Sequence, residues 1–196
     1  MLKIPYSIIL ASNSPRRQEL LAGLDIDFNV FVKKDVDESY PEGMANEKIA
    51  EYLALKKANS YRNDIKDNVI VITADTVVIN GAKILGKPSD KTEAITMLKE
   101  LSGNTHIVIT GVAITSNSKQ YSFSSLTEVS FAPLSHEEIE YYVEKYKPYD
   151  KAGSYGIQEW IGYIGIESIS GSYFNVMGLP TRRLYDALKT EFANKI

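Results

Sequence analysis

Two serines and two arginines lie together near the start of the chain, in a pattern that suits an anion. Residues 12–17 read SNSPRR and follow a short apolar run. Pro15 suits the first turn of a helix, and Ser14 suits the position that caps it. Free N–H groups at a helix start, hydroxyl groups and guanidinium groups all favour phosphate oxygens. An ordinary capped helix with solvated arginines explains the same residues, so the spacing alone leaves both interpretations open.

Carboxylates form a second group of candidate residues. Asp75 comes just past the apolar run 69–73, at the end of a predicted strand, where α/β proteins place ligands. Asp35, Asp37 and Glu38 form an acidic loop. Two carboxylates brought together could bind Mg²⁺ or Mn²⁺, and one could instead act as a general base toward water. The ordinary alternatives are a turn residue at Asp75 and a solvated surface at Asp35 and Asp37.

Three lysines are candidates for binding a polyanion. Lys57 lies on the apolar face of a predicted helix, where a side chain that reaches out to solvent is the ordinary explanation. Lys87 and Lys151 lie in the segments GKP and DKAG. His106 and His136 have no metal-ligand spacing, and the chain has no cysteine. The sequence also lacks a GxxxxGK[ST] loop and a GxGxxG segment after the first strand, which excludes two common phosphate-binding motifs.

Apolar runs and helical periods alternate along the chain, which predicts a mixed α/β fold. The Asn80–Gly81 pair predicts a hairpin, and a hairpin favours a mixed sheet with flanking helices over a purely parallel one. Strands are expected at residues 7–11, 28–32, 69–73, 77–79, 84–85, 106–115, 121–131 and 163–169, and helices at 16–24, 46–61, 90–101, 135–146 and 180–192.

Composition limits the classes of protein that fit. The 196 residues are 44% hydrophobic and 24% charged, which is ordinary for a soluble globular protein. The formal net charge of −3 disfavours a protein that binds nucleic acid through bulk positive charge, so no stable nucleic-acid partner is expected. No apolar run has the length of a signal peptide or a membrane span, which favours a cytoplasmic protein with no membrane partner.

Six short motifs follow one another in a fixed order. They are LASNSPRRQELL at residues 10–21, ADTVV at 74–78, LGKP at 85–88, LSG at 101–103, DKAGSYGIQ at 150–158 and VMGLP at 176–180. Through these motifs the chain resembles the Maf-type nucleoside triphosphate pyrophosphatases over essentially its whole length. Any one motif would be weak evidence, but their shared order makes a chance similarity improbable.

The resemblance implies a fold, an activity and a set of site residues. The implied fold is one Maf-like domain over residues 1–196, with two lobes around a deep cleft, similar to inosine triphosphate pyrophosphatases; the sequence does not place the boundary between the lobes. The implied activity is hydrolysis of a nucleoside triphosphate to the monophosphate and pyrophosphate, with a divalent cation. In that family Asp75 would accept the proton from water, Glu38 and Asp75 would hold the metal, Arg16, Thr76 and Gln158 would tune base selection, and Ser12, Arg17, Lys57, Lys87 and Lys151 would bind phosphate or support the site.

The base-tuning positions resemble the dTTP and UTP branch of the family. Arg16, Thr76 and Gln158 all match that branch, which implies a house-cleaning enzyme for pyrimidine triphosphates. Glu159 and Trp160 depart from the small residues that are usual there, and Trp160 is expected to fill the core rather than stack on a base. Two other functions stay open: a non-enzymatic nucleotide- or nucleic-acid-binding regulator of cell division, and a phosphatase that removes the terminal phosphate. The sequence also leaves a homodimer open.

Overall fold

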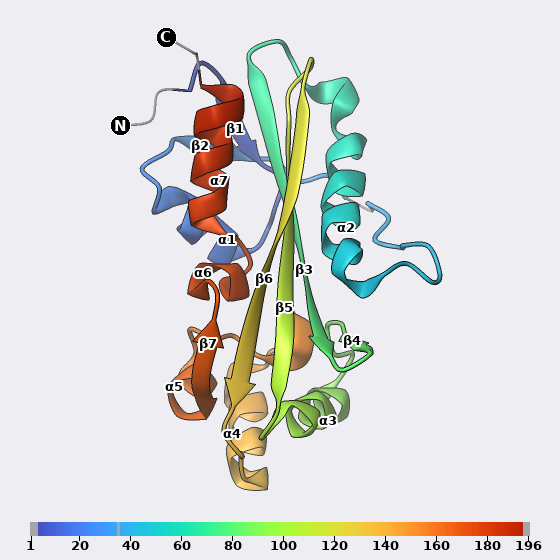
Figure 1. The fold of residues 1–196 in the computed structure, drawn as a ribbon, viewed down its shortest axis with the longest axis vertical. Helices are drawn as coiled ribbons and strands as arrows, with labels where there is room; N and C mark the ends of the chain where they lie inside the picture. The colour runs from blue at the N-terminus through green and yellow to red at the C-terminus, as the bar shows by residue number, and fades with distance from the viewer. Residues whose placement is uncertain (1–3, 35, 194–196) are drawn as a thin grey trace. The chain divides into compact units, whose positions relative to one another are not determined.

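The computed structural model describes residues 4–34 and 36–193, and it divides the chain into two compact units (Figure 1). Unit 1 contains residues 1–75, 110–125 and 178–196, and unit 2 contains residues 76–109 and 126–177. The chain passes from one unit to the other four times, three times within long strands and once between Met177 and Gly178. These strands are β3 (Val69–Asn80), β5 (Thr105–Thr115) and β6 (Gln120–Phe131).

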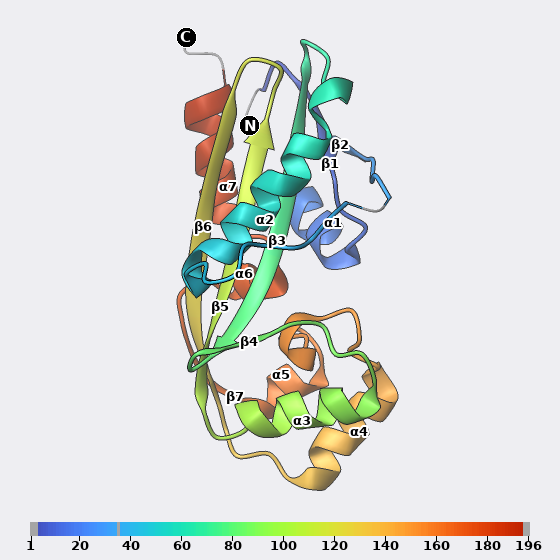
Figure 2. The ribbon, with the colours of Figure 1, turned by 90° about the vertical axis from the view of Figure 1, so that its right-hand side faces the viewer.

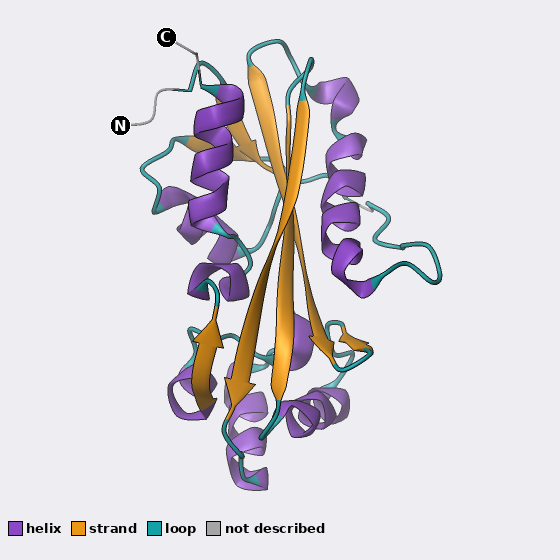
Figure 3. Ribbon diagram, viewed as in Figure 1, coloured by secondary structure: helices purple, strands orange, loops and turns teal. Residues whose placement is uncertain are grey.

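The described residues form one seven-stranded sheet in the order β2-β1-β3-β5-β6-β7, with β4 paired to β3 (Figure 3). Strand β1 (Ser7–Leu10) pairs in parallel with β2 (Phe28–Val30) and with β3. Strand β4 (Lys83–Leu85) is antiparallel to β3, and β7 (Ile166–Ser170) is antiparallel to β6. The predictions of a mixed α/β fold, a mixed sheet and a hairpin after Ile79 are therefore confirmed.

The position of Asp75 differs from the prediction. Strand β3 does not end at Thr73 but continues through Asp75 to Asn80. Its first part pairs with β1 through Val69–Ile72, and its last part pairs with β4 through Val78–Asn80. Because partners hold both ends of the strand, the polar residues in its middle do not break it. Asp75 therefore projects from the interior of a strand and not from a loop after one.

In unit 1, helices cover both faces of the sheet (Figure 2). Helix α2 lies on one face, and α1 and α7 lie on the other. Residue Gly111 explains how closely α2 approaches β5: a Cβ atom at Gly111 would lie 2.3 Å from the backbone of Ala50 and Glu51. Only glycine allows this contact. The helices of unit 1 are α1 (Pro15–Ala22), α2 (Asn46–Ser60), a short 3₁₀ turn at Arg62–Asp64, and α7 (Thr181–Ala187), which continues as a wider helical turn at Leu188–Phe192.

Unit 2 packs short helices around the remaining parts of the strands. Two helix starts carry side-chain caps: Asp90 accepts from the backbone N–H of Glu93, and Ser135 forms a capping box with Glu138. The stretch predicted as strand at 163–169 is helical at its start, because residues 160–165 form a helix before the strand begins. The helices of unit 2 are α3 (Lys91–Leu101), α4 (His136–Tyr146), a short 3₁₀ turn at Ala152–Ser154, α5 (Trp160–Gly165) and α6 (Tyr173–Met177).

The expected core position of Trp160 is wrong. Its side chain is only partly buried, and its ring packs edge-on against Tyr141, with ring centroids 4.9 Å apart. Tyr141 is itself exposed. Within the residues that the structure describes, no helix is both long and apolar enough to cross a membrane.

Candidate active site

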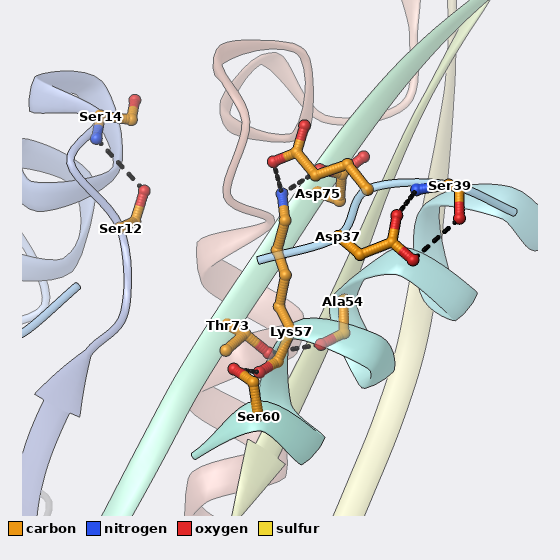
Figure 4. Close-up of polar contacts among 10 residues, drawn as sticks. Ser12, Ser14, Asp37, Ser39, Ala54, Lys57, Ser60, Thr73 and Asp75 are labelled. Carbon is orange, nitrogen blue, oxygen red and sulfur yellow. Dashed lines mark hydrogen bonds and ion pairs between the residues drawn. The ribbon is translucent and has the colours of Figure 1, made fainter. Parts of the chain in front are cut away.

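The centre of the candidate site in unit 1 is a lysine between two carboxylates (Figure 4). The ammonium nitrogen of Lys57 lies 2.5 Å from Oδ1 of Asp75 and 2.8 Å from Oε1 of Glu38. The side chains of Lys57 and Asp75 are 16% and 15% exposed, whereas that of Glu38 is 54% exposed. Lys57 therefore does not simply extend to solvent from an apolar helix face; it forms a mostly buried ion pair.

Helix α2 and strand β3 hold this pair in place. Oγ1 of Thr73, two residues before Asp75, donates to the backbone carbonyl of Ala54 on α2 at 2.7 Å. Thr73 is fully buried, so this hydrogen bond fixes the helix against the strand at the level of the ion pair. One turn further along α2, Oγ of Ser60 donates to the carbonyl of Lys57 at 2.7 Å (Figure 4).

The acidic loop is tied to the same helix by Lys56. The ammonium group of Lys56 lies 2.6 Å from Oδ2 of Asp37 and donates to the carbonyl of Ser39 at 2.7 Å. Ser39 also donates its backbone N–H to Oδ1 of Asp37 at 2.8 Å. These contacts lower the pKa of Asp37 to about 2, chiefly through the hydrogen bond from Lys56. Asp37 is exposed, as expected, but it is part of the contacts around Glu38; Asp35 lies outside the described residues.

The serine and arginine segment begins α1 as predicted. Ser14 caps the helix, since its hydroxyl accepts from the backbone N–H of Arg17, and Oγ of Ser12 accepts from the N–H of Ser14 at 3.2 Å (Figure 4). Nε of Arg17 donates to the carbonyl of Gly178 at 2.8 Å. The first and last sequence motifs thus meet inside unit 1, and Arg17 has a structural contact besides any contact with a ligand.

The charge of Arg17 is coupled to the two carboxylates. Burial lowers the pKa of Arg17 from its ordinary value, whereas Asp75 and Glu38 raise it and Arg16 lowers it. Arg17, Asp75 and Glu38 therefore influence one another electrostatically within unit 1. Ser12 is buried and Arg16 is partly exposed at the same helix start.

In unit 2, Lys151 is the buried member of the predicted lysines. Its residue is only 8% exposed, and its ammonium nitrogen lies 2.8 Å from Oδ1 of Asp150 and 3.1 Å from Oε1 of Glu159. The backbone N–H of Gly153 donates to the carbonyl of Gly86 at 3.0 Å. This hydrogen bond joins the loop of Lys151 to the loop of Lys87, which is exposed.

Gln158 has a buried side-chain acceptor that receives no hydrogen bond from the residues that the structure describes. Within the described part of the chain, its Oε1 is buried and has no hydrogen-bond partner. An unsatisfied buried acceptor is uncommon, and it costs about 1–3 kcal/mol. A ligand that donates an N–H there would recover that cost. Thr76, the other predicted base-selecting residue of this unit, is partly exposed in β3.

The donor set suits a hard divalent cation that keeps much of its own coordination shell. Among the described residues there is no group of three or more acidic or histidine side chains that could hold a metal. Glu38 and Asp75 do converge, because both reach the same lysine nitrogen. Mg²⁺ commonly binds through one or two carboxylates together with water and substrate phosphates, and these two residues fit that pattern.

The predicted residues thus fall into two groups, one in each unit. Unit 1 contains Ser12, Arg16, Arg17, Glu38, Lys57 and Asp75, and unit 2 contains Thr76, Lys87, Lys151 and Gln158. Sequence reasoning missed the contacts that orient these groups, notably Lys56 with Asp37 and Tyr142 with Glu159. The one signal in the sequence was Glu159 itself, an acidic residue at a position where the resemblance implies a small one.

The chain is similar to curated proteins over nearly its full length. It is 56% identical to the dTTP/UTP pyrophosphatase of Phocaeicola vulgatus over 184 residues, which cover 94% of this chain and 95% of that protein. It is 54% identical, with the same coverage, to the dTTP/UTP pyrophosphatase of Bacteroides thetaiotaomicron. A solved structure of a HAM1 protein from Coxiella burnetii is more distant, with 18% identity, a TM-score of 0.42, and coverage of 66% of this chain and 74% of that one.

The family comparison agrees with the order of motifs in the sequence. The model of the family described as Maf-like protein matches residues 7–191, which include every predicted site residue. The matched range also includes the Lys57, Asp75 and Glu38 contacts in unit 1 and the Lys151 loop in unit 2. On this evidence, the chain is a member of the Maf-like protein family.

Proposed function

We propose that the protein is a nucleoside triphosphate pyrophosphatase that hydrolyses dTTP and UTP to the monophosphate and pyrophosphate. The observation that carries this proposal is the similarity of 54–56% identity, over 94% of the chain, to proteins named dTTP/UTP pyrophosphatase. A role in removing unwanted pyrimidine triphosphates would follow from that activity. The contacts within each unit supply suitable chemistry.

In unit 1, Asp75 is the proposed general base. Water attacks the α-phosphorus, the bond from that phosphorus to the bridging oxygen breaks, and pyrophosphate leaves with that oxygen. The proton of the water passes to the carboxylate of Asp75. The ammonium group of Lys57 lies 2.5 Å from Oδ1 of that carboxylate and holds it in place. Ser12, Arg16 and Arg17 are the proposed phosphate ligands at the start of α1.

In unit 2, Lys87 and Lys151 are the proposed phosphate ligands, and Thr76 and Gln158 the proposed base-selecting residues. The imide N–H of uracil and thymine is a hydrogen-bond donor, whereas the corresponding ring nitrogen of cytosine is an acceptor. The buried Oε1 of Gln158 would therefore bind uracil and thymine and disfavour cytosine.

Glu38 and Asp75 are the residues that would hold Mg²⁺ or Mn²⁺. When bound, such a cation would neutralise the phosphate oxygens and stabilise the charge that develops in the transition state. The ammonium of Lys57 already contacts both carboxylates, so it would share these ligands with the cation or move aside.

Product analysis tests this proposal. Purified protein is incubated with Mg²⁺ or Mn²⁺ and a panel of UTP, dTTP, CTP, GTP and modified pyrimidine triphosphates, and both products are identified. We expect UMP or dTMP with pyrophosphate, faster from UTP and dTTP than from CTP or GTP. Release of orthophosphate and a diphosphate would identify a terminal phosphatase instead. Absence of hydrolysis with any of these substrates would favour the non-enzymatic alternative.

A further inference from the structure

Glu159 connects helix α4 with the segment of residues 150–158 that directly precedes it in the chain. The hydroxyl of Tyr142 on α4 donates a hydrogen bond to Oε2 of Glu159. Oε1 of the same carboxylate lies 3.1 Å from the ammonium nitrogen of Lys151. The hydroxyl of Tyr142 also accepts the backbone N–H of Gly156 at 3.0 Å. The carboxylate of Glu159 therefore links helix α4 to Lys151, and the hydroxyl of Tyr142 extends the link to Gly156.

These contacts are more protected from water than an ordinary surface ion pair. Tyr142 is fully buried, Lys151 is 8% exposed, and the side chain of Glu159 is 19% exposed. The second carboxylate that contacts Lys151 belongs to Asp150, whose side chain is 58% exposed. Water screens that contact more strongly, so Glu159 is the partner that restrains the ammonium group more.

The backbone beside Glu159 is shaped to receive its carboxylate. A Cβ atom on Gly156 would lie 2.9 Å from Cδ of Glu159 and 3.1 Å from Nε2 of Gln158. The side chains of Glu159 and Gln158 thus both pack onto Gly156. A shift of the Glu159 side chain would therefore displace the side chain of Gln158 as well as that of Lys151.

We propose that Glu159 is a positioning residue, which fixes the ammonium of Lys151 so that one N–H stays available to a phosphate oxygen of the substrate. A lysine ammonium has three N–H donors. The contacts with Asp150 and Glu159 use two of them, and their directions determine the direction of the third. Tyr142 is part of the same device, because its hydroxyl holds the carboxylate. The proposal rests on the proposed function, in that the ligand is a pyrimidine triphosphate.

Equilibrium binding tests this role without requiring turnover. The probe is the α,β-methylene analogue of UTP with Mg²⁺, and its Kd is measured by calorimetry for the wild type, Glu159→Gln, Lys151→Met and the double variant. Glu159→Gln keeps the size of the side chain and removes its charge. Glu144→Gln is the matched control, because Glu144 lies on the same helix as Tyr142 and forms an exposed ion pair with Lys91. Thermal unfolding of each variant verifies folding.

We expect Glu159→Gln alone to raise the Kd about tenfold relative to the wild type. Added to Lys151→Met, it should raise the Kd less than about twofold, because the effects of two residues in contact are not additive. Glu144→Gln should leave the Kd unchanged. An equal rise with and without Lys151 would overturn the proposal, and so would no rise. A tighter Kd in Glu159→Gln would also overturn it, because Glu159 would then compete with phosphate.

A second variant keeps the proposal testable if Glu159→Gln does not fold. Tyr142→Phe removes the hydroxyl that holds Glu159. It should also raise the Kd, and only when Lys151 is present. Binding of the analogue without hydrolysis of UTP by the wild type would refute the proposed function alone. No binding of the analogue by the wild type would refute both.

Discussion

Acidification should destabilise the protein through His106, a buried residue of unit 2. The residue is 1% exposed, its ring stacks on Phe131, and its Nε2 lies 2.7 Å from the hydroxyl of Tyr155. Within the described residues, its Nδ1 has no hydrogen-bond partner. A charged imidazolium would need acceptors at both nitrogens, so burial lowers the pKa of His106 from 6.5 to about 4.

The size of the effect follows from proton linkage. Between pH 6.5 and about 4, His106 is protonated in the unfolded chain and neutral in the folded protein. The unfolded state therefore binds one more proton, and the free energy of unfolding falls as the pH falls through that window. At about 1.4 kcal/mol per pH unit, the loss amounts to roughly 3 kcal/mol by pH 4. Well above pH 6.5 His106 is neutral in both states and contributes no pH dependence.

Urea unfolding of the wild type and of His106→Gln, at pH values from 4 to 7.5, measures this loss. Glutamine can keep a hydrogen bond to Tyr155 and does not titrate in this range. The carboxylates contribute equally to both curves, so the difference between the two curves isolates His106. We expect the difference to change by about 3 kcal/mol between pH 6.5 and 4. Parallel curves would refute the assignment of a buried neutral histidine.

Two further substitutions test the packing and the base selection. Gly111→Ala places a Cβ atom 2.3 Å from the backbone of α2 and should lower the free energy of unfolding by about 3 kcal/mol or more. The control is Gly23→Ala, whose Cβ atom would have ordinary 3.5 Å contacts and should change that free energy by no more than about 0.5 kcal/mol. Equal losses in urea unfolding would contradict the close approach of α2 to β5. Gln158→Glu replaces the amide with a carboxylate, whose two acceptor oxygens suit the paired N–H donors of guanine. The ratio of kcat/KM for UTP to kcat/KM for GTP should therefore fall about tenfold. An unchanged ratio would show that Gln158 does not select the base.

Much of the fold was predictable because local signals and packing agree. Ser14 caps its helix as predicted, and the Asn80–Gly81 turn forms the expected hairpin. The continuous strand through Asp75 was not predictable from local signals, since aspartate is depleted in strands. Partners at both ends of β3 override that local preference.

The candidate site was predictable as a set of residue types but not as a set of contacts. The sequence places Lys57 on an apolar helix face, and the structure adds the contact with Asp75, 18 residues away, which makes that position favourable. The role of Tyr142 was not predictable, because helical spacing does not distinguish a buried tyrosine that forms a functional hydrogen bond from an ordinary core residue. Its link to Glu159 depends on the packing of distant segments, which no local pattern reveals.

In the proposed reaction, Asp75 is the base in the release of pyrophosphate. The most direct measurement is kcat for UTP with Mg²⁺ in the wild type and in Asp75→Asn, with Asp186→Asn as a control that removes an exposed carboxylate of the same unit. We expect a loss of about 10²–10⁴-fold in Asp75→Asn, the range for removal of a general base, and no loss in the control. Turnover in Asp75→Asn within about threefold of the wild type, with pyrophosphate still the product, would contradict the account.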